Sequence, residues 1–390
     1  MRTRFVVASV AALLAAVSCF DQRQAPDVPT SPSFAKGGGG PKLKSITVSP
    51  SSASITAGQT IQLTATASPP NTATTFTWAS ANTAVATVST SGLVTAVAQG
   101  TTSITASSGG VTGSSTITVT SVSADPVLVG AGDIASCSSS GDEATANLLD
   151  GISGTVFTLG DNAYDSGTAT EYTNCYGPSW GRHKARTKPS PGNHEYNTTN
   201  ATGYYGYFGS AAGDPTKGYY SYELGNWHIV VLNSNLSCAV ISCAAGSTQE
   251  QWLRADLAAN TKPCTLAYWH HPRFNSGADH GNDLDVAPFW DALYEFNADV
   301  ILNGHEHVYE RFAPQTPSAV ADPVRGIRQF TVGTGGRSKY TFGTIQPNSE
   351  VRDATSYGVL KLTLHSNTYD WQFVPVAGSS FTDSGTGSCH

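Results

Sequence analysis

The stretch VFTLGDNAY, residues 156–164, joins a short apolar run to a glycine turn that carries an acid, an amide and a phenol. Val156 to Leu159 have the length and composition of a buried strand. An earlier apolar run, Val127 to Val129, is a second strand candidate, and Asp142 to Asp150 between them is expected to form a short helix. A strand, a helix and a strand within ~30 residues predict a βαβ unit with parallel pairing.

The same alternation of strands and helices continues toward the C-terminus. Further strands are predicted at 227–232, 266–269, 300–302 and 328–332, a hairpin at 358–374, and helices at 249–259 and 286–297. Leu253 and Leu257 share one face of the first of these helices. Mixed strands with helices on both sides predict a layered α/β sandwich for residues 124–390.

Five short polar motifs lie in this region, and four of them directly follow a predicted strand. The motifs are Gly132-Asp133, Gly160-Asp161-Asn162-Ala163-Tyr164, Gly192-Asn193-His194-Glu195, Trp269-His270-His271-Pro272 and Gly304-His305-Glu306-His307. The third motif is expected in a loop. Side chains at the carboxyl ends of strands in α/β folds meet in one crevice. Because carboxylate, amide, imidazole and phenolate groups bind hard and borderline metals, the pattern predicts a metal site.

Taken together, the motifs resemble those of the metallophosphoesterases, and the tyrosine three residues after Asp161 resembles the purple acid phosphatases. The resemblance covers residues 127 to about 375 and implies a four-layer α/β/β/α sandwich with mixed sheets. It also implies two metal ions, bridged by Asp161. Carried over by position, it makes Asp133, Tyr164 and His307 ligands of one ion, makes Asn193, His270 and His305 ligands of the other, and turns His194 and His280 toward the substrate.

Local chemistry agrees with this carry-over. Two cations about 3.5–4 Å apart need a shared anion to limit their repulsion, and Asp161 on a tight turn supplies one. If the His305–His307 pair is extended, both rings point to one face and serve neighbouring ions. Glycine before Asp133, Asp161, Asn193 and His305 is expected to let the backbone approach the crowded centre.

Two departures from the wider superfamily are informative, and the first bears on the identity of the metals. Asp133-Ile134-Ala135 has no histidine where many relatives carry one, so Tyr164 is needed to complete the first ion's ligands. A phenol with a reference pKa of about 10 is deprotonated readily only by a strongly acidic ion. This favours Fe(III) at the Tyr164 position and a divalent Zn, Mn or Fe ion at the other. His271 lies beside His270, and the family's His-x-Pro pattern favours His270 as the ligand.

The predicted activity is hydrolysis of phosphate esters, phosphomonoesters above all, by attack of a metal-bound hydroxide. His194 is expected to stabilise charge on the phosphate oxygens, and His280 to protonate the leaving group. His280 is alternatively an exposed loop histidine. A phosphodiesterase or a nucleotidase on the same metal core is an alternative function. An alternative of another class is a surface adhesion protein with an inactive phosphoesterase scaffold.

Residues 43–122 have a different composition. Short alternating runs, among them one from Ile61 to Thr66, are separated by glycine turns and predict an all-β sandwich with Trp78 in its core. The segment Ser91 to Ala96 resembles a hairpin of the bacterial Ig-like domains of group 2. Without any histidine, cysteine or acid, the segment offers no catalytic chemistry. It is expected to act as a spacer or to contact cell-surface or envelope material.

The N-terminus predicts export. Residues 1–19 combine two arginines, an apolar run and small residues before Cys19, as in a secretory signal. The segment Ala16-Val17-Ser18-Cys19 resembles a bacterial lipoprotein signal, in which Cys19 is lipidated; an ordinary cleaved signal is the alternative. Residues 20–42 are rich in proline and glycine and are expected to form a flexible linker. The mature chain is therefore expected to be secreted or anchored to the envelope.

Cysteine usage and charge agree with export. After Cys19, six of the seven cysteines remain, an even number that suggests disulfides in an exported chain. Cys238 and Cys243 are expected to pair locally, Cys137 and Cys175 lie near the site loops, and Cys264 and Cys389 would tie the last residues to a central strand, although six cysteines allow many pairings. With a net charge of -7 and no basic cluster, nucleic acid is excluded as a structural partner.

Overall fold

The computed structural model describes residues 41–121 and 125–390. These fall into two compact units that divide between Val122 and Ser123. The predicted signal peptide of residues 1–19 with Cys19, and the linker of residues 20–42 up to residue 40, lie outside the described residues. Within the described ranges, no helix has the length and apolar character needed to cross a bilayer.

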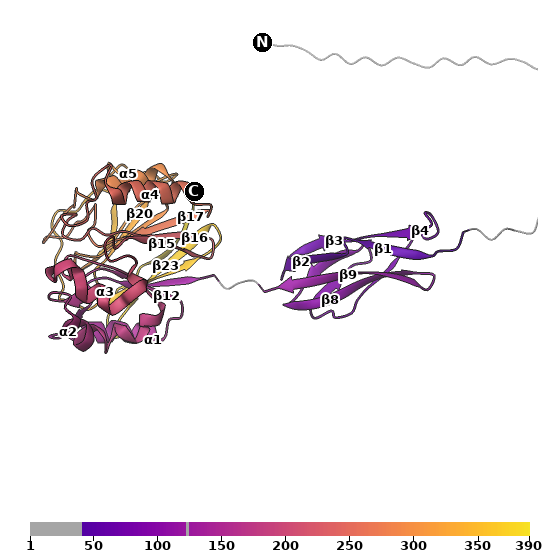
Figure 1. Cartoon of the computed structure of the whole chain (residues 1–390), viewed down its shortest axis with the longest axis horizontal. Helices are drawn as coiled ribbons and strands as arrows, with labels where there is room; N and C mark the ends of the chain where they lie inside the picture. Colours follow the sequence, from indigo (N-terminus) through magenta and orange to yellow (C-terminus); the bar gives the residue numbers. More distant parts are fainter. Residues whose placement is uncertain (1–40, 122–124) are drawn as a thin grey trace, which may run out of the picture. The chain divides into compact units, whose positions relative to one another are not determined.

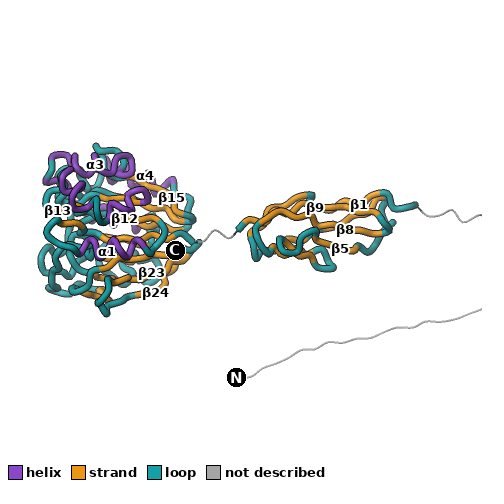
Figure 2. Tube along the Cα trace, turned by 90° about the horizontal axis from the view of Figure 1, so that it is seen from below, coloured by secondary structure: helices purple, strands orange, loops and turns teal. Residues whose placement is uncertain are grey.

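The N-terminal unit contains strands and no helix within residues 41–121, as Figure 2 shows. Its strands form three small sheets with the orders β1-β4, β2-β9-β8-β5 and β3-β7-β6. Burial alternates along β9, where Ile117 and Val119 face the core and Thr118 lies between them. The strands are β1 (Ser45–Ser49), β2 (Ser52–Thr56), β3 (Thr60–Gln62), β4 (Thr64–Ser68), β5 (Thr77–Ser80), β6 (Ala86–Val88), β7 (Leu93–Ala96), β8 (Gly100–Ser108) and β9 (Val111–Thr120).

Two details of this unit differ from the prediction. The expected single strand from Ile61 to Thr66 is broken into β3 and β4, which pair with different sheets on either side of the buried Leu63. Trp78 is only partly buried and packs at the margin of the core. Its indole covers Gly92, where a side chain would lie 2.8 Å from the ring. The smaller Ile104 and Ile117 fill the centre instead.

The C-terminal unit contains two mixed sheets. The first has the order β14-β12-β10-β22-β23-β24, and its first three strands are parallel. The six strands of this sheet are β10 (Val127–Ala131), β12 (Thr155–Leu159), β14 (Thr187–Ser190), β22 (Gly358–Leu364), β23 (Thr368–Pro375) and β24 (Ser384–Ser388). A short two-stranded pairing joins β11 (Ala135–Ser136) to β13 (Ala163–Tyr164).

The second sheet has the order β15-β16-β17-β18-β20-β19-β21, with parallel pairing from β16 to β20. Its strands are β15 (Tyr220–Leu224), β16 (Trp227–Val231), β17 (Cys264–Tyr268), β18 (Val300–Asn303), β19 (Tyr309–Phe312), β20 (Arg328–Val332) and β21 (Ser349–Asp353). Phe157 and Tyr268 from the two sheets belong to one buried core, with ring centroids 5.9 Å apart. The sheets therefore pack face to face.

Helices cover both outer faces of this pair of sheets. The helices α4 (Thr248–Ala259) and α5 (Ala287–Glu295) lie on one side, and α1 (Gly141–Asp150) and α2 (Ala169–Glu171) on the other (Figure 1). Leu253 and Leu257 of α4 are buried against the second sheet, as their spacing predicts. The predicted four-layer α/β/β/α sandwich is confirmed.

The connection between β13 and β15 was not predicted. Apart from α2 and β14, it consists of short helical turns, which are η1 (Tyr172–Tyr176), η2 (Trp180–Arg186), η3 (Glu195–Asn197), η4 (Thr199–Ala201), α3 (Thr202–Phe208) and η5 (Gly209–Ala212). Aromatic side chains hold it together, since Tyr172 stacks on Tyr207 and packs edge-on against Phe208. Such aromatic packing leaves no helical period in the sequence.

Three disulfides cross-link the C-terminal unit. They join Cys137 to Cys175, Cys238 to Cys243, and Cys264 to Cys389. The expected local bridge and the expected tie of the last residues to a central strand are both present. The bridge from β17 to Cys389 fixes the end of the chain beside the core.

Candidate metal centre

Parallel strands from both sheets deliver the predicted site residues to one place. Asp133 and Asp161 follow β10 and β12 of the first sheet, while His270 and the His305–His307 segment follow β17 and β18 of the second. Backbone bonds join these turns, because the amide of Asp133 donates to the carbonyl of Gly160 over 3.1 Å. The motifs meet at the carboxyl ends of the strands, as in other α/β folds.

The third motif also follows a strand, which the sequence analysis missed. Gly192-Asn193-His194-Glu195 comes directly after β14, which pairs in parallel with β12. β14 reads Thr-Lys-Pro-Ser and holds Pro189, which removes a backbone donor and argues against a strand within a sheet. At this edge of the sheet, β14 has a neighbour on one side only, so the proline is tolerated.

The phenol of Tyr164 is the centre of a first group of donors. Its Oη donates to Asp133 Oδ1 over 2.9 Å and lies 3.1 Å from Asp161 Oδ2 and 3.2 Å from His307 Nε2. His307 Nε2 in turn lies 3.4 Å from Asp133 Oδ1. All four side chains are buried.

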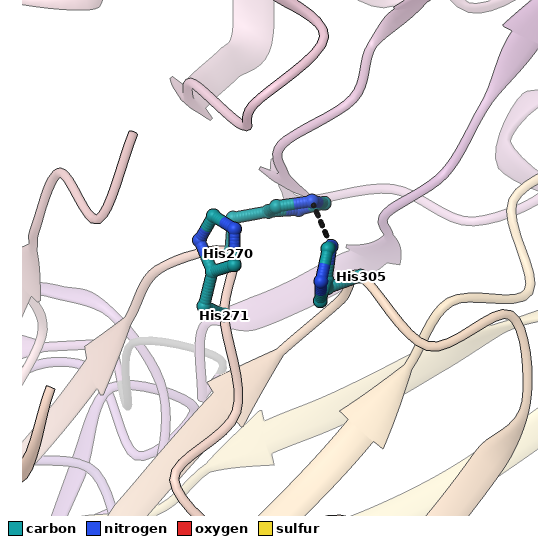
Figure 3. Close-up of side chains that lie close together, drawn as sticks. All are labelled: His270, His271 and His305. Atoms are coloured by element: carbon teal, nitrogen blue, oxygen red, sulfur yellow. Dashed lines mark hydrogen bonds between the residues drawn. The ribbon is translucent and has the colours of Figure 1, made fainter. Parts of the chain in front are cut away.

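The imidazole of His270 is the centre of a second group. Its Nε2 lies 3.0 Å from Asn193 Oδ1 and 3.3 Å from Asp161 Oδ2. His305 Nδ1 faces the same nitrogen at 3.1 Å, the contact drawn as a dashed line in Figure 3. Four donors from four separate turns thus converge on one point.

Asp161 belongs to both groups. Its Oδ2 contacts Tyr164 on one side and His270 on the other, while its Oδ1 accepts a hydrogen bond from the amide of His194 over 2.9 Å. Donor atoms of Asp133, Asp161 and His270 lie within 4.8 Å of one another. A carboxylate in this position is placed to be shared by two cations.

The tautomers of two histidines suit metal binding. Nδ1 of His270 donates to the carbonyl of Leu159 over 2.7 Å, and Nδ1 of His307 donates to the carbonyl of Ser338 over 2.6 Å. A ligating histidine commonly donates its other ring N–H to such an acceptor, which orients the ring and frees Nε2. The residues present therefore fit a pair of bound cations.

Burial and mutual charge set the protonation of these donors. Burial, together with the charges of Asp133 and Asp161, raises the pKa of Tyr164 well above its ordinary value. Burial would lower the pKa of His270, but the negative charge of Asp161 outweighs it and raises that pKa to about 9. Burial and four neighbouring histidines hold the pKa of His305 well below its usual range. Without a cation, the cluster therefore favours a protonated Tyr164 and His270 and a neutral His305.

The prediction of an extended His305–His307 pair was wrong. His305 has a left-handed backbone with φ of 72°, and the residues after β18 form bends. Its amide donates to Asp133 Oδ2 over 2.9 Å, which holds the bend in place. The bend still turns the two rings to neighbouring groups, His305 to His270 and His307 to Tyr164.

Glycine is required where these turns touch. A Cβ on Gly192 would lie 2.3 Å from Asp161 Oδ1, and one on Gly304 would lie 2.8 Å from Asp133 Oδ2. Asp133 and Asp161 themselves have left-handed φ values of 60° and 49°. Such strain is concentrated at functional sites, where the surrounding structure supports it.

His271 lies beside the second group of donors, but its ring makes different contacts from that of His270. Its Nδ1 bonds to the hydroxyl of Ser234 over 2.8 Å, and its ring centroid lies 4.3 Å from that of His305. Donor atoms of His270, His271 and His305 nevertheless lie within 4.8 Å of one another. The contacts to Asn193 and Asp161 belong to His270, the residue that the sequence pattern favours.

Two histidines at the edge of the centre are partly exposed to solvent. The side chains of His194 and His280 are 28% and 36% exposed, whereas His270 and His307 are buried. Nδ1 of His194 bonds to the carbonyl of Asp165 over 2.6 Å, and the ring of His280 lies 4.0 Å from that of His305. Both residues therefore border the face from which a substrate can approach.

Glu195 contacts the turns of the candidate site, and the sequence analysis gave it no role. Its buried carboxylate accepts from the amides of Asp161, Asn162 and Gly192 over 2.7–2.9 Å. It also accepts from the hydroxyl of Tyr172 over 3.0 Å. Glu195 thus fixes the turn of Asp161 against the turn of Asn193, and the signal was its place in the third motif.

Arg337 was also missed, and no motif marks it. Its guanidinium lies 4.6 Å above the ring of Tyr164 and bonds to Asp165 Oδ1 over 2.9 Å. Its amide donates to the carbonyl of Asp133. It therefore packs against the phenol ring of Tyr164.

Comparisons with known proteins find matches to both units of the chain. The family model of the bacterial Ig-like domain (group 2) matches residues 42–119, and that of the calcineurin-like phosphoesterases matches residues 128–309. An uncharacterised protein of Mycobacterium tuberculosis is 27% identical over 206 residues, 44% of this chain and 39% of its own length. Purple acid phosphatase 22 of Arabidopsis thaliana is 34% identical over 155 residues, 37% of this chain and 34% of its own length. The chain thus spans well under half of these relatives.

Solved structures share the fold. The purple acid phosphatase PPD1 of yellow lupin (Lupinus luteus) matches with a TM-score of 0.56 at 16% identity, over 84% of this chain and 67% of that one. The Plasmodium protein GAP50, described as the anchor in the inner membrane complex, matches with a TM-score of 0.54 at 11% identity, over 69% and 90%. The C-terminal unit therefore resembles the calcineurin-like phosphoesterases, and among them the purple acid phosphatases, while the N-terminal unit resembles the bacterial Ig-like domains of group 2.

Proposed function

We propose that the chain is an exported hydrolase of phosphate esters that uses two metal ions and takes phosphomonoesters as substrates. The observation that carries this proposal is the position of Asp161, whose Oδ2 lies 3.1 Å from Tyr164 Oη and 3.3 Å from His270 Nε2. One carboxylate between two sets of donors suits a pair of ions that share a ligand.

The two sets favour different ions. Asp133, Tyr164 and His307 would hold Fe(III), because a phenol gives up its proton readily only to a strongly acidic ion. Asn193, His270 and His305 would hold divalent Zn, Mn or Fe, which accept imidazole and amide oxygen. When bound, the cations would lower the pKa of water and offset the charge of the phosphate.

Two histidines of the chain would contact the substrate itself. Nδ1 of His194 donates to the carbonyl of Asp165, so Nε2 is the nitrogen left to face the substrate, and in the imidazolium form it would donate to a phosphate oxygen. His280 would give a proton to the leaving oxygen. Its pKa is raised chiefly by the hydrogen bond to Glu306, against the opposing effect of burial.

Turnover by the metal-loaded mature chain is the test. Wild type, Asp161→Asn and the exposed control Asp214→Asn are assayed with p-nitrophenyl phosphate and its bis-ester, and their metal content is measured. We expect monoester hydrolysis by wild type and control, and a loss of at least about a hundredfold with Asp161→Asn. Faster hydrolysis of the bis-ester would favour the phosphodiesterase. Full metal content without turnover of any ester would favour a binding protein with an inactive scaffold.

Export and anchoring form part of the proposal. Three disulfides support an oxidising compartment, and the apolar N-terminal segment before Cys19 supports a secretory route. A single acyl group gives only marginal membrane binding, so a diacylated Cys19 is the form that would anchor the chain. Cys19→Ala should move the protein from the membrane fraction to the medium; an unchanged distribution would contradict anchoring at Cys19.

A further inference from the structure

Glu306 occupies the position between the two histidines of the Gly304–His307 motif, yet its carboxylate turns away from the metal donors. The side chain is completely buried. Its three hydrogen-bonding partners are Asn275, Asp279 and His280, all in the loop after β17. A buried carboxylate is costly unless it is fully hydrogen bonded, so this environment is built around it.

The loop is shaped to receive this carboxylate. Oε2 accepts from Asn275 Nδ2 over 2.9 Å and from His280 Nδ1 over 3.1 Å, and Oε1 lies 3.3 Å from the amide of Asp279. A Cβ on Gly277 would lie 2.0 Å from Oε1 of Glu306. The absence of a side chain at Gly277 is therefore a requirement for the contact between Glu306 and His280.

The contact determines which nitrogen of His280 faces outward. A carboxylate can only accept, so Nδ1 of His280 carries the hydrogen in this pair, and Nε2 is the atom left for other partners. The ring packs against His305 at 4.0 Å and against Tyr340 at 5.5 Å, which fixes its plane. Since its side chain is 36% exposed, His280 remains accessible beside the second group of donors.

We propose that Glu306 is the positioning residue of His280, holding Nδ1–H so that Nε2 is presented to the leaving oxygen of the ester. This inference rests on the proposed phosphoesterase function. In the step, the oxygen of water bonds to phosphorus, and the leaving oxygen takes the electron pair of the broken P–O bond. That oxygen also takes the proton of His280 Nε2, which solvent restores after the proton of the attacking water has been released.

The test is a double-mutant cycle with two substrates. Wild type, Glu306→Gln, His280→Ala and the double variant are loaded with metal and assayed with p-nitrophenyl phosphate and with glycerol 2-phosphate, whose leaving group needs a proton far more. Glutamine keeps the size but must place an N–H toward one of the three donors. We expect Glu306→Gln to lower kcat on glycerol 2-phosphate by about 10–100-fold, and on p-nitrophenyl phosphate by less than about threefold.

The cycle separates positioning from a general structural role. In the His280→Ala background, Glu306→Gln should cost no further activity beyond about twofold, because its effect passes through His280. Equal losses on both substrates, or an undiminished loss in that background, would overturn the inference. Glu310→Gln is the matched control, since buried Glu310 accepts from the amide of Ser276 in the same loop over 2.9 Å. It should show no dependence on the leaving group.

A second readout does not need turnover. Nitrogen-15 spectra of the zinc-loaded protein, assigned by the signal missing in His280→Ala, should place a hydrogen on Nδ1 of His280 and lose or shift that signal in Glu306→Gln. A wild type with bare Nδ1 would overturn the inference by itself. If wild type hydrolyses no ester but the spectra behave as expected, the proposed function fails while the Glu306–His280 pair stands.

Discussion

Tyr164 places a phenol between two carboxylates, an arrangement that is unfavourable for a phenolate without a cation. Burial and the two acids raise its pKa, so in the metal-free protein it stays protonated and donates to Asp133. A strongly acidic ion would reverse this balance by taking the place of the proton. The guanidinium of Arg337, 4.6 Å from the centre of the ring, adds a positive charge next to the phenol.

The colour of the purified protein tests whether Tyr164 binds iron. If Fe(III) is bound by Tyr164, the purified protein absorbs visible light through charge transfer from the phenolate. We expect Tyr164→Phe to abolish the band and to lower the iron content, and Tyr340→Phe, in which the stacked neighbour of His307 is changed, to retain it. An iron-loaded protein whose band survives Tyr164→Phe would contradict iron binding by Tyr164.

Glu195 supports the candidate centre through hydrogen bonds to its backbone turns. Because its carboxylate accepts from several backbone amides and from Tyr172, Glu195→Gln replaces one acceptor with a donor inside a buried network. We expect the free energy of unfolding to fall by about 1–3 kcal/mol, measured by urea denaturation.

The control for Glu195 is an exposed glutamate. Glu143 pairs with Arg182 at the surface, and its side chain is 49% exposed. Glu143→Gln should cost less than about 1 kcal/mol. A loss at Glu195 no larger than this would show that the network does not stabilise the turns.

At the scale of elements, His228 joins three of them. It lies on β16, is 5% exposed, and bonds to Glu223 Oε1 of β15 over 2.8 Å and to Asp256 Oδ2 of α4 over 2.7 Å. Burial lowers its pKa, but the bonds to Asp256 and Glu223 outweigh burial and raise the pKa above 6.5. The folded state therefore favours the imidazolium.

This raised pKa predicts a pH-dependent contribution to stability. A group whose pKa is higher in the folded state stabilises fully below its unfolded pKa, and the stabilisation is lost as pH rises through the folded pKa. Compared with His228→Gln, wild type should be more stable by about 1.5–3 kcal/mol near pH 5.5. In chemical unfolding experiments, the difference should shrink as the pH rises through the raised pKa of His228. A difference that is constant with pH would contradict the pairing.

Regular elements were predictable because their apolar residues lie in the strands and helices that pack the core. The βαβ unit is present, with β10 and β12 parallel and α1 between them. β14 was missed because Pro189 argues against a strand, and its edge position, which permits proline, is not visible in the sequence. The bend at His305 depends on its amide bonding to Asp133, a contact between residues far apart in the chain.

The site was predictable as a set of residue types, and less so as a geometry. The fold brings together the acids, amide, phenol and imidazoles that the motifs predicted. The hydrogen-bonding roles of Glu195, Glu306 and Arg337 depend on folding, because their partners come from other turns. No local spacing rule contains such contacts.

At the scale of the whole molecule, disulfides of very different span test what holds the C-terminal unit together. Cys264–Cys389 closes a separation of 125 residues, and Cys238–Cys243 one of 5. If constraint of the unfolded chain dominates, replacing both cysteines of the long bridge by alanine should cost about 4–5 kcal/mol. The same change in the short bridge should cost about 2 kcal/mol.

Thermal and urea unfolding of the two double-alanine variants measure this contrast. The short bridge is the control, since both variants remove two cysteines from the same unit. Equal losses would contradict the entropic account and point to local packing around each bridge.

The central claim is that two ions bind on either side of Asp161, and anomalous X-ray diffraction from crystals of the metal-loaded chain tests it most directly. The account predicts two peaks about 3.5–4 Å apart, one beside Tyr164 and one beside His270, with the Asp161 carboxylate touching both. A fully loaded protein whose peaks lie elsewhere, or a single peak that Asp161 does not touch, would contradict it.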